Sequence, residues 1–193
     1  LQETDHRVSA HNVRASLVRA QADRLGLPLH EIYLPRPCPN TVYEARIGSA
    51  VEKLRAEKGI EDHIFGDLFL QDIRDYREKN LKTANLQAHF PLWGEDTYKL
   101  ADEMIALGLE AYIVAINLDV MPANLCGVRF DKDFLNTLPP NIDPCGENGE
   151  FHTVVTNMMH FSSPIEIVIG GYQITGNHMY ADFRIKGTEG NRK

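Results

Sequence analysis

The sequence predicts an α/β protein with a parallel sheet, followed by a smaller segment of α+β structure. Two observations carry this prediction. In the first part, short apolar strand candidates alternate with helical patterns over short connections, which is typical of right-handed βαβ units. Toward the C-terminus the apolar residues recur with period two, which is typical of antiparallel strands. We expect the first domain over residues 1–83 and the second over 84–193.

The elements of the first part are predicted from helix and turn signals. Ser9 is the expected N-cap of the first helix, which Gly26 ends. A capping box of Thr41 and Glu44 begins the second helix, and Gly59 ends it. The predicted order is helix, strand, helix, strand, helix, over residues 10–25, 29–34, 41–58, 63–65 and 68–79.

The second part is predicted from the same signals. Asp96 is the expected cap of a helix that Gly108 ends. The continuous apolar run over 111–116 indicates a buried strand. Gly176-Asn177 is a two-residue hairpin signal between two alternating strands. The other expected features are a strand over 86–90, a short helix over 130–138, a loop over 139–149 and a frayed tail from Gly187 on.

Composition excludes several classes of function. The chain has 27 acidic and 20 basic residues, a net charge of −7, and no Lys/Arg cluster, which argues against binding to nucleic acid or a membrane surface. No apolar run is long enough to span a bilayer. The three cysteines, Cys38, Cys126 and Cys145, are odd in number and far apart, so we expect reduced thiols in a cytoplasmic protein. Nothing in the sequence decides between a monomer and a homodimer.

Ligands of open α/β sheets bind beyond the carboxyl ends of strands, where this sequence places small and acidic residues. Gly66-Asp67 follows the strand at 63–65, and Asp67 could bind a ribose or a metal-bound phosphate. Asn117 and Asp119 follow the buried strand. The alternative for both places is an ordinary turn.

A third candidate is the stretch 143–153. Its glutamates, Glu147 and Glu150, could bind a cation or transfer a proton to an amine, and His152 could titrate near neutral pH. The alternative is a Gly-rich turn with solvated carboxylates. A zinc site at Cys145 and His152 lacks a second pair of ligands, so no resident metal is expected.

Four other side chains have both a functional and a structural interpretation. Arg74 and Arg77 could reach a phosphate or carboxylate, or could form ion pairs on a solvated helix face. Trp93 could form a stacking wall for a ligand, or could pack in the core. His11 has a surface position as its simpler interpretation.

Four stretches together resemble one family. They are RVSAHNVR at 7–14, FGDLFL at 65–70 with the helix after it, FPLWG at 90–94, and DPCGENGEFHT at 143–153. Their order and composition resemble the diphthine–ammonia ligase family of ATP pyrophosphatases, in the adenine-nucleotide alpha-hydrolase superfamily. The resemblance spans residues 3–164.

The resemblance implies a Rossmann-like sheet of HUP type over 1–83 that binds ATP, with a C-terminal substrate-binding domain. It implies an ATP- and Mg²⁺-dependent ligase in which a carboxylate is activated as an acyl-adenylate and then attacked by ammonia, leaving AMP. The implied residues fall into three groups. Nucleotide contacts are Gly66, Asp67, His11 and Arg14; substrate contacts are Arg74, Arg77, Glu78, Trp93 and Gly149; catalytic residues are Glu147, Glu150, His152 and Thr153.

Two departures from the family pattern qualify the expectation. The family's N-terminal strand and its Ser-Gly-Gly-x-Asp-Ser pyrophosphate loop are absent; because the first residue is Leu1 rather than Met, we expect them to precede it. Asn148 and His152 replace a Gly and a Glu of the diphthamide-forming branch, so the sequence resembles a bacterial branch with another substrate. The alternatives are another adenylating ATP pyrophosphatase and a noncatalytic nucleotide-binding module.

Overall fold

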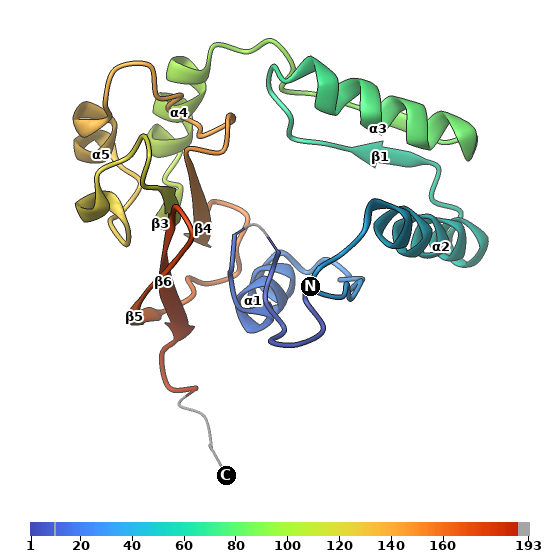
Figure 1. The fold of residues 1–193 in the computed structure, drawn as a ribbon, viewed down its shortest axis with the longest axis horizontal. Helices are drawn as coiled ribbons and strands as arrows, with labels where there is room; N and C mark the ends of the chain where they lie inside the picture. Colours follow the sequence, from blue (N-terminus) through green and yellow to red (C-terminus); the bar gives the residue numbers. More distant parts are fainter. Residues whose placement is uncertain (10, 189–193) are drawn as a thin grey trace.

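A computed structural model of the chain describes residues 1–9 and 11–188. It shows a mixed α/β protein with a small parallel sheet and a larger antiparallel sheet (Figure 1). In Figure 1, α2, α3 and β1 lie on one side of the molecule, and the antiparallel sheet with α4 and α5 lies on the other. The elements are α1 (Ala15–Leu25), α2 (Asn40–Lys58), β1 (Asp62–Ile64), α3 (Gln71–Thr83), β2 (Gln87–His89), α4 (Thr97–Ala106), β3 (Glu110–Asn117), η1 (Ala123–Leu125), α5 (Lys132–Thr137), β4 (Phe151–Asn157), β5 (Ile167–Thr175) and β6 (His178–Ile185).

The first helix is confirmed at its end but not at its start. Gly26 takes the left-handed conformation at φ 65° and closes α1, as its lack of a Cβ allows. The prediction of Ser9 as N-cap is wrong, because α1 begins only after Arg14. The strand predicted over 29–34 is also wrong: of that stretch only Leu34 forms a bridge, parallel to Gln2.

The second helix shows the same contrast. Gly59 ends α2 in the left-handed conformation, as predicted. The capping box of Thr41 and Glu44 is wrong, because α2 starts at Asn40 after Pro39 and has no side-chain cap. Proline before a helix needs no such cap for its own nitrogen, since it carries no N–H.

The βαβ unit predicted around residue 66 is confirmed. β1 and β2 pair in parallel, with His63 opposite Ala88, and α3 connects them. Within the described residues this parallel sheet has two strands, fewer than a full α/β domain requires. The carboxyl end of β1 leads through Gly66 and Asp67 into α3, which places this turn at the edge of the sheet where ligands bind.

The second half forms a four-stranded antiparallel sheet in the order β4-β3-β6-β5. Asp96 caps α4 by accepting hydrogen bonds from the N–H groups of Tyr98 and Lys99, as predicted. The apolar run of β3 is buried on both faces, and Gly176-Asn177 connects β5 to β6 in the predicted hairpin. The predicted tail lies outside the described residues from position 189 on.

The main core lies on this antiparallel sheet and includes α1. Leu17 of α1 is 1 % exposed and belongs to the same buried cluster as Ile113 and Phe151. The Gln21 side chain of α1 donates a hydrogen bond to the carbonyl of Val155 on β4, at 2.8 Å. The first helix is therefore part of the packing of the C-terminal sheet.

No helix among the described residues is both long enough and apolar enough to cross a membrane.

Candidate functional site

The turn after β1 is held by two contacts. Asp67 pairs with Arg77 of α3 at 2.8 Å, and its side chain is 11 % exposed. Leu68 is buried, and its carbonyl accepts a hydrogen bond from the N–H of Gly94 at 2.8 Å. The predicted nucleotide residues Gly66 and Asp67 therefore lie in a turn whose backbone position is fixed.

The loop before β4 is built around two buried carboxylates. Asp143 accepts hydrogen bonds from the N–H groups of Cys145, at 3.1 Å, and Glu147, at 2.9 Å. Glu150 also bonds within the loop. Its Oε1 accepts hydrogen bonds from the N–H of Asp143 at 3.1 Å and from the side-chain amide of Asn148 at 2.9 Å. The acidic residues of this stretch thus order the loop, which excludes the interpretation of it as solvated carboxylates.

Glycine allows this loop to close tightly. Gly146 has φ 71°, and a Cβ built there would lie 2.7 Å from the carbonyl oxygen of Phe151. Gly149 has φ 82°, and its N–H bonds to the carbonyl of Gly146 at 3.0 Å. Both conformations disfavour a side chain.

The Cys145 thiol of the same loop stays protonated. Burial, followed by the charges of Asp143 and Glu147, raises the pKa of Cys145 to about 12.

One hydrogen bond joins the loop to the turn. The Glu147 carboxylate accepts from the N–H of Leu68 at 2.7 Å. The acidic loop therefore lies beside the carboxyl end of β1, next to Gly66 and Asp67, and does not point into bulk water. This contact brings together two candidate stretches that are far apart in the sequence.

The predicted substrate residues gather on aromatic rings beside this turn. The Arg74 guanidinium lies over the rings of Phe90 and Trp93, at 4.8 and 4.7 Å from their centroids. Arg77 lies over Phe65 at 4.5 Å. Arg74 also donates a hydrogen bond to Glu78 at 2.7 Å. Cation–π contacts of this kind orient the two arginines, so one face of Trp93 is already occupied.

His11 and His152 form a second group on the antiparallel sheet. Their rings stack in parallel, with centroids 4.2 Å apart and planes at 9°. Burial, followed by the charges of His11 and His178, lowers the pKa of His152 to about 4. Burial lowers the pKa of His11 as well. Both rings are therefore neutral at neutral pH, which permits the stack.

Asp182 of β6 holds the loop that carries His11. Nε and Nη2 of Arg14 donate to its two oxygens at 2.7 Å each, and Nη2 of Arg7 donates at 2.7 Å. Arg7 and Arg14 also form a backbone bridge that closes the loop; Ala10, within it, lies outside the described residues. The guanidinium of Arg14, a predicted nucleotide contact, is thus engaged with β6.

Sequence reasoning missed Asp182, and it named Asn148 only as a departure from the family pattern. Asp182 alternates with the apolar residues Ala181 and Phe183 of β6, and this period-two pattern was a usable signal that the polar members share the opposite face. Thr153 pairs with Ile113 in the β3–β4 ladder, so its backbone is part of the sheet.

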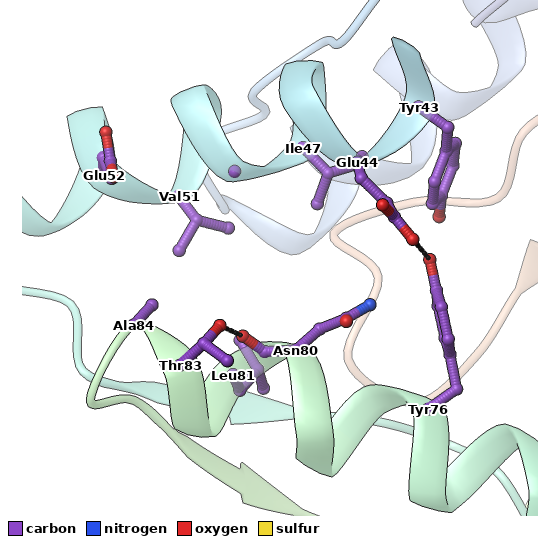
Figure 2. A pocket seen from close by; sticks show the side chains of 11 residues that line it. Tyr43, Glu44, Ile47, Val51, Glu52, Tyr76, Asn80, Leu81, Thr83 and Ala84 are labelled. Atoms are coloured by element: carbon purple, nitrogen blue, oxygen red, sulfur yellow. Dashed lines mark hydrogen bonds between the residues drawn. The ribbon is translucent and has the colours of Figure 1, made fainter. Parts of the chain in front are cut away.

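A cavity of about 360 Å³ lies elsewhere, between α2 and α3 (Figure 2). In Figure 2, Tyr43 and Ile47 of α2 face Tyr76 and Asn80 of α3 across it. None of the predicted site residues lines this cavity. It adjoins the C-terminal half of α3, whereas the Gly66–Asp67 turn leads into the N-terminus of that helix.

The fold and the loop define a two-part α/β protein in which an acidic loop of the antiparallel half meets the βα turn of the parallel half. Residues 96–186 match the family model described as the diphthamide synthase C-terminal domain. The segment from α4 to β6 is therefore similar to this diphthamide synthase domain, and the resemblance to the diphthine–ammonia ligase family is confirmed over these residues. No curated protein gives a significant match to the chain.

Proposed function

We propose that the protein is an ATP-dependent ligase that forms an amide from a carboxylate and ammonia. The contact between Glu147 and Leu68, at 2.7 Å, carries the proposal, because it sets the acidic loop of the family domain against the βα turn where α/β sheets bind nucleotides. In this proposal residues 1–83 would form the HUP-type Rossmann-like domain, whose first helix also packs on the antiparallel sheet, and residues 84–193 would form the substrate domain.

The reaction needs ATP because a carboxylate is a poor electrophile. The carboxylate oxygen would attack the α-phosphate of ATP, releasing pyrophosphate and forming an acyl-adenylate. Ammonia would then attack the acyl carbon and release AMP. Proton removal from the attacking ammonia falls to a carboxylate or imidazole near the loop, which makes Glu147 and His152 the candidates.

The residues divide between the two substrates in this proposal. Gly66 and Asp67 would contact the nucleotide, with His11 and Arg14 at its border. Arg74, held by Phe90 and Trp93, and Arg77, held by Phe65, would bind the anionic substrate. Glu78, Gly149, Glu150 and Thr153 would support these groups through α3 and the loop.

Mg²⁺ would neutralise the phosphate charges. In such sites the ion is usually held by phosphate oxygens and one or two carboxylates, and Asp67 offers one carboxylate at the end of β1. The described residues contain no group of three or more His, Cys, Asp or Glu side chains that could hold a metal alone. The single carboxylate of Asp67 fits a Mg²⁺ ion that arrives bound to the nucleotide.

The setting and the substrate are further parts of the proposal. Cys38, Cys126 and Cys145 are free thiols, which supports a cytoplasmic location. Asn148 donates to Glu150 inside the loop, and His152 stacks on His11. These two departures from the diphthamide-forming pattern support the bacterial branch, in which an acid other than diphthine is the substrate.

The test is pyrophosphate and AMP release by the natural full-length protein with ATP, Mg²⁺, ¹⁵N-ammonium and a panel of carboxylic acids. We expect one acid to stimulate release and to gain ¹⁵N as an amide. Glu147→Gln should abolish turnover and leave ATP affinity within about twofold, whereas the exposed Glu166→Gln should not change either. Release of pyrophosphate and AMP without ¹⁵N incorporation would identify another adenylating enzyme. ATP binding without pyrophosphate release would identify a noncatalytic module. Either result overturns the proposal of a ligase.

A further inference from the structure

A β-bulge interrupts the pairing of β5 with β6 opposite Asp182. Ile169 pairs with Phe183 and Tyr172 with Ala181, so Gly170 and Gly171 share the place opposite Asp182. Gly171 has φ 147°, which L side chains rarely adopt. A Cβ at Gly170 would lie 2.6 Å from Nε of Arg184. The glycine pair therefore makes room for Arg184 to fold over the strand, and bulges of this kind often adjoin functional sites.

Three arginines converge on the single carboxylate of Asp182. Arg7, Arg14 and Arg184 lie 2.7, 2.7 and 3.0 Å from its oxygens. One carboxylate balances one of these charges, so the group keeps a local excess of two positive charges. The Arg7 side chain is only 17 % exposed, which limits the screening of its charge by water.

Two adjoining cavities open beside this cluster. One, of about 210 Å³, is lined by Arg7, Asp182 and the Gly170–Gly171 bulge. The other, of about 160 Å³, extends to Arg36 and Asp5. Both share the side chains of Arg7, Asn12, Gln173 and Tyr180. The shared wall is almost entirely made of hydrogen-bonding groups, which suits a small polar ligand and not an apolar one.

We propose that the Arg7 cavities form a binding site for a small oxyanion, a carboxylate or phosphate group. Arg7 and Arg36 supply the positive charge, and the amide and phenol groups of the shared wall supply further hydrogen bonds. Arg7, Arg14 and Arg184 share the one carboxylate of Asp182, so together with Arg36 the four arginines outnumber the two carboxylates at the cavities, Asp182 and Asp5. The site does not involve the turn at Gly66 and does not rest on the proposed ligase activity.

The test is an NMR titration of the chain, without ATP, with inorganic phosphate in one series and malonate in another at constant ionic strength. We expect saturable shifts of the Gly170, Gly171 and Arg7 amides with at least one anion. Saturable shifts with phosphate alone would assign a phosphate ligand, and saturable shifts with malonate alone would assign a carboxylate ligand. Saturable shifts with both would assign a site that accepts either kind of oxyanion. The absence of saturable shifts with both overturns the site.

Variants make the test specific. Arg36→Gln should weaken binding by about fivefold, and Arg7→Gln by more than about tenfold, since each removes one positive charge at the ligand. Arg129→Gln is the matched control, because Arg129 pairs with Glu110 outside both cavities. If Arg7→Gln does not fold, Arg36→Gln alone decides: affinity equal to that of Arg129→Gln overturns the proposal.

Discussion

The carboxylate of Glu147 bonds to the backbone N–H of Leu68 across 79 positions of sequence. Leu68 is buried and its carbonyl is held by Gly94, so the turn at the end of β1 cannot shift without breaking this contact. The loop before β4 and the start of α3 are therefore coupled.

Replacing Glu147 by alanine should loosen that coupling. A hydrogen bond to a charged group contributes about 1.5–3 kcal/mol, so we expect the Leu68 amide to exchange with solvent at least about tenfold faster. Hydrogen exchange read by NMR measures this. Glu147→Gln keeps an acceptor and should exchange at an intermediate rate, and the exposed Glu103→Ala should match the natural chain. An unchanged Leu68 rate in Glu147→Ala contradicts the coupling.

Glu150 should act on stability. Its Oε1 bonds to Asp143 and Asn148 in a buried place, whereas its Oε2 has no hydrogen-bond partner in the part of the chain that the structure describes. Glu150→Ala leaves the buried N–H of Asp143 unpaired, so we expect the free energy of unfolding to fall by about 2 kcal/mol in a urea titration. Glu150→Gln should lose less, because its carbonyl still accepts. A loss no larger than in Glu166→Ala would contradict this role.

Stability should depend on pH through His152. Its pKa is about 4 in the folded chain, below the ordinary value of 6.5, because burial and then His11 and His178 disfavour its charge. The unfolded chain therefore binds more protons between these two values, and stability present above pH 6.5 is lost as the pH falls toward 4. We expect His152 to account for about 1–2 kcal/mol of that loss.

His152→Gln should flatten the pH dependence of unfolding between pH 4 and 6.5, measured by urea titration at several pH values. His160→Gln is the control, since His160 is exposed. A slope that is equally steep in both variants would show that another group titrates there.

Asp182 should be required for the position of the His11 loop. Burial favours protonation of its carboxyl, but hydrogen bonds from Arg14 and Arg7 outweigh it and hold the pKa well below the usual range. Asp182→Asn leaves three guanidiniums facing one another, so we expect a loss of about 2 kcal/mol in unfolding and altered His11 ring resonances by NMR. Asp102→Asn removes an exposed ion pair with Lys132 and should change neither the free energy of unfolding nor the His11 resonances. Unaltered His11 resonances would mean that the loop is held by other contacts.

The features predicted correctly from sequence depend on local chemistry. Gly26 and Gly59 end their helices because glycine takes the left-handed conformation easily, and Asp96 caps α4 with its own side chain. The incorrect prediction of Ser9 as N-cap has a distant cause. The segment before α1 is a loop fixed by Asp182, 168 positions away from Arg14, and no local pattern at Ser9 reports that contact.

The candidate site likewise has one part that could be predicted from the sequence and another that could not. The place of Gly66 and Asp67 at the carboxyl end of a strand follows from a general rule about sheet edges, and it was predictable. The contact of the acidic loop with this turn does not follow from that rule, because the loop precedes β4 of the antiparallel sheet. The bonding partners were not predictable from the sequence either. The bond from a main-chain N–H to Glu147 and the stacking of His11 on His152 both depend on how two parts of the chain pack. The strand expected over 29–34 failed because apolar alternation cannot show whether a neighbouring strand exists to pair with it.

The packing of α1 on the antiparallel sheet has a consequence for synthesis on the ribosome. Leu17 packs in the core of a sheet whose β6 strand is made long after α1. At roughly 5–20 residues per second, the nascent helix would wait on the order of ten seconds or more for its docking surface. During this interval its apolar stripe is open to holdase chaperones, so α1 docks only long after it has been made.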